Sequence, residues 1–261
     1  MINVLYRLMR ISYEKLYGEQ QMLHYPLYKD GTENLLQGQT YLTDYCLSHL
    51  RNLDDKRLLD IGCGNGIQTL YIGEKYRPQY LYGVDLSPMH VDLAKQERQR
   101  RGLAQVDFGV DNAQSLASVA DGSFDAAICI ESSHHYPNKY AFLSQVKRVL
   151  RPGGQFVIAD LIRKDDREPS RLEGKLYLFH WHPQRYRDAV SQLKMALLKD
   201  EDITDAILPA FHSTEHWLNK PAGVSANAHR VGRVLGRILI ALYKLQLERY
   251  FRYHLLVGRR D

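Results

Sequence analysis

The chain has 261 residues, with 35 lysines and arginines against 30 aspartates and glutamates, giving a formal net charge of +5. Hydrophobic residues make up 44% and charged residues 25%, which is typical of a globular protein and argues against a disordered or fibrous chain. The small basic excess is not gathered in one tail, so composition gives no reason to expect nucleic acid as a partner. The three cysteines form no CxxC pair, which disfavours a disulfide framework or a structural zinc site.

No segment of the sequence predicts stable membrane insertion. The longest uninterrupted apolar run, residues 238–243, is far shorter than the roughly 18–20 residues that a spanning helix needs. The N-terminus lacks the charged and then apolar order of a signal peptide. We therefore expect a cytoplasmic protein. The sequence gives no indication of an oligomeric state.

The first 55 residues are rich in tyrosine and have helical spacing, so we predict a helical N-terminal cap at 1–55. From about residue 56, short apolar runs alternate with helical segments, which is typical of stacked βα units. The predicted strands are 57–61, 80–86, 106–110, 124–130 and 155–161. The predicted helices are 68–76, a segment opened by Ser87-Pro88, and 140–150, the last ending at a turn over 151–154.

Beyond the fifth strand, residues 163–171 are charged and are predicted to form a solvated loop. We interpret 163–225 as a lid or substrate insertion with a weak strand near 195–203, and 226–261 as a helix and closing strand, 250–258, that return to the core. The fold class that follows is α/β, with a Rossmann-like, doubly wound, seven-stranded sheet whose cofactor-binding core spans 56–162.

The main motif is the run Asp60-Ile61-Gly62-Cys63-Gly64-Asn65-Gly66, which follows a strand and precedes a helix. Glycines allow a tight turn and a close approach of the backbone to a ligand. Asp85 ends the next strand, where a carboxylate can accept hydrogen bonds from both hydroxyls of a ribose. The spacing departs from the dinucleotide pattern G-x-G-x-x-G, and Asp60 places a negative charge at the loop. A ligand with a ribose, a purine and a cationic end, such as S-adenosylmethionine (SAM), fits better than NAD.

Over residues 56–162 the sequence resembles the class I SAM-dependent methyltransferases. The resemblance rests on the segments L-D-I-G-C-G-N-G at 59–66, Asp85, Asp111-Asn112-Ala113, Phe124-Asp125 and L-R-P-G-G at 150–154. It implies SAM as cofactor and S-adenosylhomocysteine as product. The residues that it implies in cofactor binding are Asp60, Gly62, Gly64, Gly66, Asp85, Leu86, Met89, Asp111, Asn112, Ala113 and Glu131. For Leu86 and Met89, ordinary core packing is an equal alternative.

The segment Glu131-Ser132-Ser133-His134-His135-Tyr136-Pro137 follows the fourth strand, where ligands bind in a doubly wound sheet. DNA and protein-glutamine methyltransferases resemble one another in having the motif N-P-P-Y at this place, and that motif is absent here. The pattern E-S-x-x-H-x-P instead resembles that of enzymes that methylate sugars, quinones, tocopherols, sterols and mycobacterial lipids. The candidate catalytic residues are His135 as general base and His134 as second choice. Asp160 is the third candidate, and we expect it to orient His135 or to contact the substrate. The alternatives are a positioning role for the histidine and a loop-capping role for Asp160. No spacing predicts a metal site.

We therefore predict SAM-dependent methyl transfer to a small, partly hydrophobic molecule, with O-methylation favoured over C- or N-methylation. The alternative is a SAM-binding protein of the same fold that acts as a cyclase or scaffold without transfer. A nucleic-acid methyltransferase is disfavoured. The amphipathic segment 231–247 allows peripheral contact with a membrane, although such helices more often cover a sheet.

Overall fold

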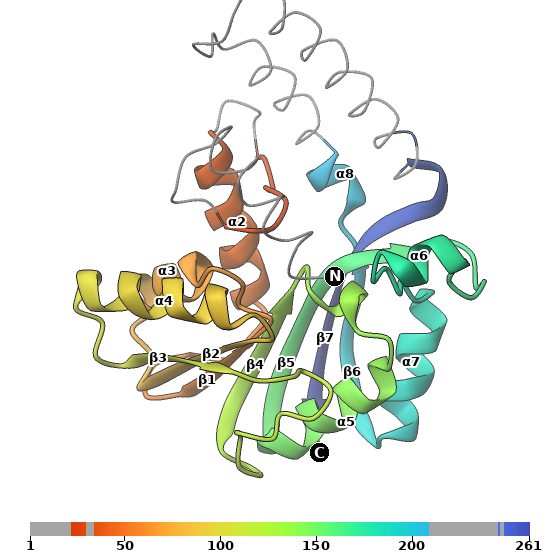
Figure 1. Cartoon of the computed structure of the whole chain (residues 1–261). Coiled ribbons are helices and arrows are strands. Elements are labelled where there is room, and N and C mark those ends of the chain that lie inside the picture. The colour runs from red at the N-terminus through yellow and green to blue at the C-terminus, as the bar shows by residue number, and fades with distance from the viewer. Residues whose placement is uncertain (1–21, 30–33, 209–244, 246–247) are drawn as a thin grey trace, which may run out of the picture.

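The structure, a computed structural model, describes residues 22–29, 34–208, 245 and 248–261. Seven strands form one sheet in the order β3-β2-β1-β4-β5-β7-β6 (Figure 1). The strands are β1 (Arg57–Ile61), β2 (Tyr80–Asp85), β3 (Val106–Val110), β4 (Phe124–Ile130), β5 (Leu150–Arg163), β6 (Met195–Asp202) and β7 (Phe251–Arg260). The helices are α2 (Leu35–Leu47), α3 (Ile67–Tyr76), α4 (Pro88–Arg101), a 3-10 turn (Ser133–His135), α5 (Lys139–Val149), α6 (Arg171–Lys175), α7 (Pro183–Gln192) and α8 (Thr204–Ile207).

The first five strands pair in parallel, and β7 lies antiparallel between β5 and β6. The predicted doubly wound, seven-stranded sheet is therefore confirmed, including the two late strands. The strand order reverses between β1 and β4, which opens a crevice outside their carboxyl ends. Residues 59–61 of β1 and the end of β4 thus deliver the glycine loop and the histidine segment to the same edge of the sheet.

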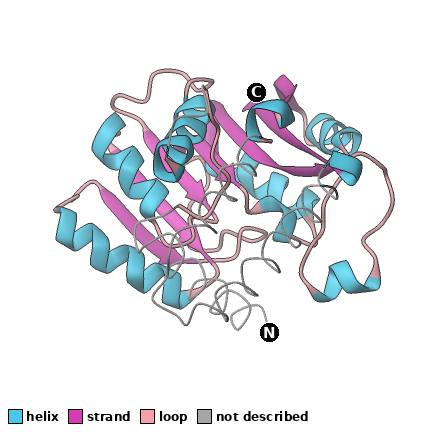
Figure 2. Cartoon of the chain, turned by 90° about the horizontal axis from the view of Figure 1, so that it is seen from above, coloured by secondary structure: helices cyan, strands magenta, loops and turns pink. Residues whose placement is uncertain are grey.

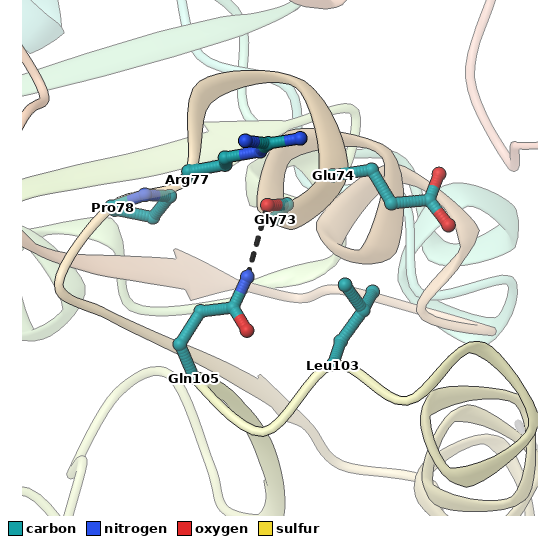
Figure 3. A pocket seen from close by; sticks show the side chains of 6 residues that line it. All are labelled: Gly73, Glu74, Arg77, Pro78, Leu103 and Gln105. Atoms are coloured by element: carbon teal, nitrogen blue, oxygen red, sulfur yellow. Dashed lines mark hydrogen bonds between the residues drawn. The ribbon is translucent and has the colours of Figure 1, made fainter.

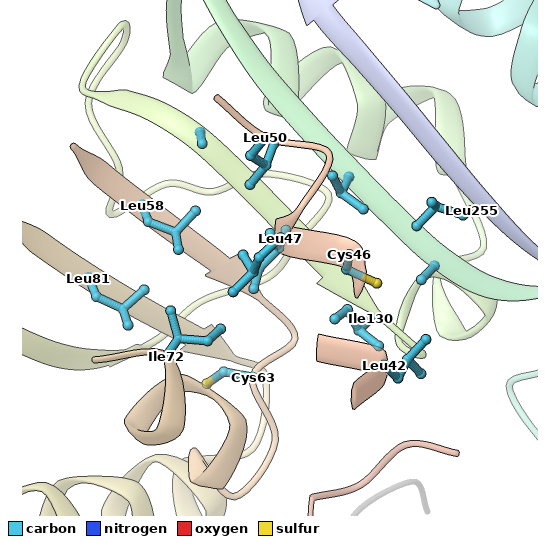
Figure 4. Packing of buried hydrophobic residues seen from close by; sticks show 14 of the residues in the cluster. Leu42, Cys46, Leu47, Leu50, Leu58, Cys63, Ile72, Leu81, Ile130 and Leu255 are labelled. Atoms are coloured by element: carbon cyan, nitrogen blue, oxygen red, sulfur yellow. The ribbon is translucent and has the colours of Figure 1, made fainter. Parts of the chain in front are cut away.

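Helices cover both faces of the sheet (Figure 2). On one face, Leu42 and Leu47 of α2 pack over Leu58 of β1 and Leu81 of β2 (Figure 4). On the other face, α5 and α7 pack against the alternate side chains of the same strands, beginning with Leu59. The central strands β4 and β5 thus contribute to two cores, which is why their buried stretches are continuous apolar runs rather than alternating ones.

Local sequence fixes the ends of the helices. The Ser87 hydroxyl accepts a hydrogen bond from the backbone N–H of His90, and Pro88 occupies the first turn of α4, as predicted. Gly102 closes that helix at φ +67°, a conformation that favours glycine. At α2, Asn34 and Gln37 form a reciprocal capping box.

Two sequence predictions about the fifth strand need correction. The helix before it ends at Val149, yet residues 151–154, predicted as a turn, are part of β5, with an irregular register opposite Phe124 and Ala126. Arg163, predicted to begin a solvated loop, is buried at the end of β5. Its guanidinium pairs with Asp165 and Glu173, so the charge is neutralised where it is buried.

The segment predicted as an insertion, 163–225, contributes α6, α7 and β6, and β6 lies at the edge of the sheet. Its separation as a lid, like the division into a cap and a core, stays a proposal. The amphipathic segment 231–247 lies outside the described residues except Leu245. Among the helices that the structure describes, none is long and apolar enough to cross a membrane.

We expect Gly258→Ala to destabilise the fold because a Cβ at this position of β7 would lie 2.2 Å from Cζ of Phe156 and 3.0 Å from the carbonyl oxygen of Ala196. Phe156 is itself buried and paired with Gly258 across the two strands. The free energy of unfolding should fall by about 1–3 kcal/mol in a urea titration. Gly174→Ala is the matched control, since open space surrounds Gly174 and its φ is ordinary for an L residue. Equal stability of the two variants would contradict the expectation.

Candidate active site

The loop between β1 and α3 has a tight path that depends on its glycines. Its three glycines, Gly62, Gly64 and Gly66, have φ values of +77°, +54° and +78°. A Cβ at Gly62 would lie 2.1 Å from the Ser132 hydroxyl oxygen and 2.7 Å from that of Tyr136. Only glycine therefore fits here without displacing the residues that follow β4. The loop and the histidine segment are packed against each other through this position.

Asp60 lies beneath the loop and contacts its neighbours rather than solvent. Its side chain is buried, and its oxygens accept hydrogen bonds from the Thr69 hydroxyl at 2.6 Å and from the Gln68 amide at 3.2 and 3.3 Å. Burial raises the pKa of Asp60 to about 6, although the bonds from Thr69 and Gln68 oppose the shift. The carbonyl oxygen of the Gln68 side chain is buried without a hydrogen-bond partner. A buried acceptor beside a carboxylate suits a cationic hydrogen-bond donor.

Asp85 connects the loop to the next strand. Its Oδ2 accepts a hydrogen bond from the backbone N–H of Gly64 at 3.0 Å, and its Oδ1 accepts one from that of Ser87 at 2.9 Å. The neighbouring Leu86 is 57% exposed, so its alternative role in core packing is wrong, whereas Met89 is partly buried. An apolar side chain left open beside a strand-end carboxylate suits a planar, hydrophobic ring.

The side chain of Asp111 organises its own loop. Its two carboxylate oxygens accept hydrogen bonds from the backbone N–H groups of Asn112, Ala117 and Ser118 and from the Ser118 hydroxyl. Ala113 is buried next to it. The segment 111–113 therefore presents a backbone that is held in place at the end of β3.

Glu131 follows β4 and has a left-handed backbone conformation, with φ +49°. Its Oε1 accepts hydrogen bonds from the backbone N–H of Tyr25 at 2.6 Å and from the Tyr253 hydroxyl at 2.9 Å. The carboxylate thus joins the N-terminal segment to β7. Burial raises the pKa of Glu131 to about 8, and the two hydrogen bonds oppose the shift without cancelling it.

The carboxylate of Asp160, at the end of β5, holds the histidine segment. It is buried, and its Oδ1 lies 2.6 Å from Nδ1 of His134. Its Oδ2 accepts hydrogen bonds from the backbone N–H of His134 at 2.8 Å and from the Ser133 hydroxyl at 2.6 Å. Burial opposes the ionised form, but the bonds from His134 and Ser133 outweigh it and hold the pKa of Asp160 below its usual value. The sequence-based expectation that Asp160 orients His135 is therefore wrong, because the 3-10 turn directs His134 to it.

The Asp160 contact fixes the tautomer of His134. An ionised carboxylate only accepts hydrogen bonds, so Nδ1 of the neutral ring carries the proton and Nε2 carries the lone pair. The capping alternative holds as well, since Oδ1 also accepts a hydrogen bond from the backbone N–H of Leu161 at 2.7 Å. Asp160 thus both fixes the end of β5 and orients a candidate base.

His135 is held by a segment that crosses over the 3-10 turn. Its Nδ1 donates to the carbonyl oxygen of Tyr177 at 2.8 Å, and the backbone N–H of Phe179 donates to the carbonyl oxygen of His134 at 2.7 Å. Burial, with His134 adding to it, lowers the pKa of His135 to about 4. A ring that stays neutral across the physiological range is a weak proton acceptor. We name residues 177–181 the strap.

Several residues of the site were not singled out from the sequence. Lys139 is buried at the start of α5, and its ammonium donates to the carbonyl oxygens of Tyr136 and Phe179, so it ties the turn to the strap. His180, in the strap, stacks its ring on that of His134 at a centroid distance of 5.2 Å. A lysine four residues after a histidine pair gives no signal by itself, because only the fold brings the strap to it.

A separate hollow lies away from the candidate residues. It has a volume of about 450 Å³ and lies at the end of α3, where the Gln105 amide donates to the carbonyl oxygen of Gly73 at 3.1 Å (Figure 3). Its other lining residues are Glu74, Arg77, Pro78 and Leu103. None of the candidate residues lies there, so we do not assign it to the site.

Comparison with known proteins agrees with this geometry. The family model of the methyltransferase domain matches residues 59–158. A fatty-acid O-methyltransferase of Mycolicibacterium smegmatis is 34% identical over 207 residues, which cover 78% of this chain and 72% of that protein. The chain belongs to the class I SAM-dependent methyltransferases. It lies in their small-molecule branch and is an enzyme that uses SAM as cofactor.

Two further similarities concern one relative in sequence and one in fold. A phthiotriol/phenolphthiotriol dimycocerosates methyltransferase of Mycobacterium leprae is 33% identical over 168 residues, which cover 61% of this chain and 58% of that protein. The crystal structure of the [4+2]-cyclase SpnF superposes with a TM-score of 0.81 at 22% identity, covering 99% of this chain and 94% of that one, and shows the fold alone. Solved methyltransferases of this fold contain SAM or S-adenosylhomocysteine.

We expect Gly62→Ala to lower the affinity for SAM at least about 100-fold, because the new methyl group would overlap Ser132 and Tyr136 and displace the loop. Isothermal titration of the purified enzyme measures the loss. Gly122→Ala is the control, since Gly122 also has a positive φ, +55°, but open space around it. If Gly62→Ala and Asp85→Asn both bind SAM as tightly as the wild type, the assignment of the cofactor residues is wrong.

The raised pKa of Glu131 predicts a pH-dependent stability. Between its ordinary pKa of 4.5 and about 8, the folded enzyme binds a proton that the unfolded chain releases. The free energy of unfolding contributed by this group therefore falls as the pH rises through that window, by about 1–4 kcal/mol in total. Glu131→Gln keeps both acceptor contacts without the charge, so it should be more stable than the wild type at pH 9 and similar at pH 4.5 in urea titrations.

Glu201→Gln is the control, because the pKa of Glu201 is shifted in the opposite direction and its effect on stability should have the opposite pH dependence. Burial opposes ionisation of Glu201, but the Tyr45 hydroxyl and Lys199 hold its pKa below the usual value. Its replacement should cost stability above pH 4.5 and little below it. A difference between wild type and Glu131→Gln that stays constant with pH would contradict the account of Glu131.

Proposed function

We propose that this methyltransferase transfers a methyl group from SAM to a hydroxyl oxygen of a small, partly hydrophobic molecule, with His134 as general base oriented by Asp160. The observation that carries the proposal is the 2.6 Å contact between Nδ1 of His134 and the buried carboxylate of Asp160 at the carboxyl ends of β4 and β5. A histidine held in this way presents Nε2 as its proton acceptor.

The proposed cofactor site is built from the glycine loop and its neighbours. The backbone of Gly62 and Gly64 and the acceptors of Asp60 and Gln68 suit the cationic methionine end. Asp85 suits the ribose hydroxyls. Gly66 is a further proposed contact of the loop. The proposed contacts around the adenine are Leu86, Met89, Asp111, Asn112 and Ala113. Glu131 is proposed to close the N-terminal segment over the site.

SAM supplies an electrophilic methyl group when bound. The enzyme's own contribution is to place the acceptor oxygen in line with that group, remove its proton and exclude water. As the oxygen–methyl bond forms and the methyl–sulfur bond breaks to leave S-adenosylhomocysteine, Nε2 of His134 takes the hydroxyl proton, and the ionised Asp160 stabilises the imidazolium. His135 stays neutral because its pKa is lowered to about 4, so we assign it a positioning role against the strap.

Two observations support a lipid-like or natural-product acceptor. The names of the relatives include a fatty-acid O-methyltransferase and a rifamycin methyltransferase. The strap that faces the histidine pair carries aromatic and apolar side chains from Tyr177 to Trp181. The alternative of a cyclase or scaffold rests on a fold similarity to SpnF at 22% identity, whereas relatives above 30% are named methyltransferases, so we do not propose it.

The test uses SAM labelled in the methyl group, the purified enzyme, and two matched acceptors of equal chain length, an alcohol and a fatty acid. We expect label in the alcohol, and His134→Ala should slow that transfer by roughly 10²–10⁴ while SAM affinity stays within about threefold. A carboxylic acid is ionised at neutral pH and needs no base, so any transfer to the fatty acid should be spared in the variant.

His135→Ala is the matched control at the adjacent position. We expect it to raise KM more than it lowers kcat, since the ring only positions the turn. If His135→Ala causes the large loss in kcat and His134→Ala does not, the two roles are exchanged. If no acceptor is labelled although SAM binds, methyl transfer to this class of molecule is excluded.

A further inference from the structure

Apolar side chains are exposed together on and just after α6. Leu172 is 66% exposed, Leu176 40% and Tyr177 37%, whereas most large hydrophobic residues that the structure describes are buried in the two cores. Leu172 lies in α6, and Leu176 directly follows the last residue of the helix, so the two leucines are exposed at the same short element. A group of exposed apolar side chains on one short element indicates a contact surface, whereas single apolar residues scattered over a surface do not.

Two cations flank these side chains. Arg171 and Lys175 are exposed, four residues apart, and neither forms an ion pair with any residue in the described part of the chain. Nearby charges are mostly neutralised, since Asp165 and Glu173 pair with Arg163 and Arg167. The surface of α6 is thus apolar with an uncompensated positive rim, which complements an anionic amphiphile.

Two sets of contacts hold α6 in place while its apolar side chains face solvent. Ser170 and Glu173 form a reciprocal capping box at its start. Glu173 also pairs at 2.7 Å with the guanidinium of Arg163, whose side chain is 2% exposed at the end of β5. The apolar side chains therefore face solvent on an anchored helix, not on a frayed one.

The same helix connects to the histidine pair. Tyr177, two residues beyond α6, has a left-handed conformation with φ +56°, and its carbonyl oxygen accepts the hydrogen bond from Nδ1 of His135. The strap that begins there continues to His180, which stacks on His134. A molecule that reaches α6 is therefore close along the chain to the residues that hold the histidine pair, and α6 lies near the carboxyl end of β5 (Figure 1).

We propose that α6, through Leu172, Leu176 and Tyr177 with Arg171 and Lys175, docks on the surface of an anionic lipid aggregate and so receives a lipid acceptor at the strap. The leucines and the tyrosine enter the boundary between headgroups and acyl chains, and the two cations contact the anionic headgroups. The inference rests on the proposed function, because it assumes an amphiphilic acceptor. It concerns a described helix and is independent of segment 231–247.

Co-sedimentation with vesicles of phosphatidylcholine mixed with phosphatidylglycerol tests the proposal. The double substitution Leu172→Ser with Leu176→Ser should lower vesicle affinity at least about tenfold. Leu198→Ser is the matched control, since Leu198 is 48% exposed on β6 and should change affinity by less than about twofold. Arg171→Ser with Lys175→Ser should weaken binding to the mixed vesicles and leave binding to pure phosphatidylcholine unchanged.

The outcomes separate this inference from the proposed function. Transfer to a short, water-soluble alcohol should remain within about twofold in the leucine variant, which also shows that it folds. Unchanged vesicle binding in that variant, or an equal loss in Leu198→Ser, overturns the proposal. A change in the solution mass of the variant without vesicles also overturns it, because the surface would then join protein chains. Absence of transfer by a wild type that binds vesicles contradicts the proposed function alone.

Discussion

The organisation of the site depends on one buried negative charge, the carboxylate of Asp160. A charge taken out of water must be compensated by hydrogen bonds, and Asp160 obtains them from the Ser133 hydroxyl, from the backbone and ring of His134, and from the backbone of Leu161. Because the donors on Ser133 and His134 belong to the turn after β4, the end of β5 holds that turn in its shape. The same compensation selects the tautomer of His134, so a structural requirement and a catalytic one are met by the same contact.

The turn is held from its other side by the strap. Lys139, His134 and His135 each contact the backbone of residues 177–179, and the strap itself continues from a helix anchored on the buried Arg163. The two buried cations therefore have related structural roles. Lys139 ties the turn to the strap, and Arg163 ties α6 to the sheet. The apolar surface of α6 and the histidine pair are in this way parts of one continuous assembly, which connects acceptor entry with the chemistry that we propose.

The cofactor side is organised by close packing. The loop can follow its path only because Gly62 has no side chain, and that absence lets Ser132 and Tyr136 lie directly against it. Asp85 then fixes the loop by accepting the N–H of Gly64. The glycine loop and the histidine turn, more than 60 residues apart in the sequence, are thus positioned by each other, which brings the proposed methyl donor site and the proposed base to one crevice.

The sequence by itself determined the sheet, the glycine loop and the family, because strand periodicity, the spacing from Gly66 to Asp85 and the Ser87-Pro88 cap are local and each has a direct physical cause. It also placed the candidate catalytic residues in one short segment and at Asp160. Only the tertiary structure decided that Asp160 holds His134 and not His135, that Arg163 is buried, and that Lys139 meets the strap. Adjacent histidines are equivalent in a sequence, and they become distinct because His134 contacts the carboxylate of Asp160 on a distant strand whereas His135 contacts the carbonyl oxygen of Tyr177. Contacts between residues far apart in the sequence produce no repeating residue pattern, so they can be identified only from the folded structure.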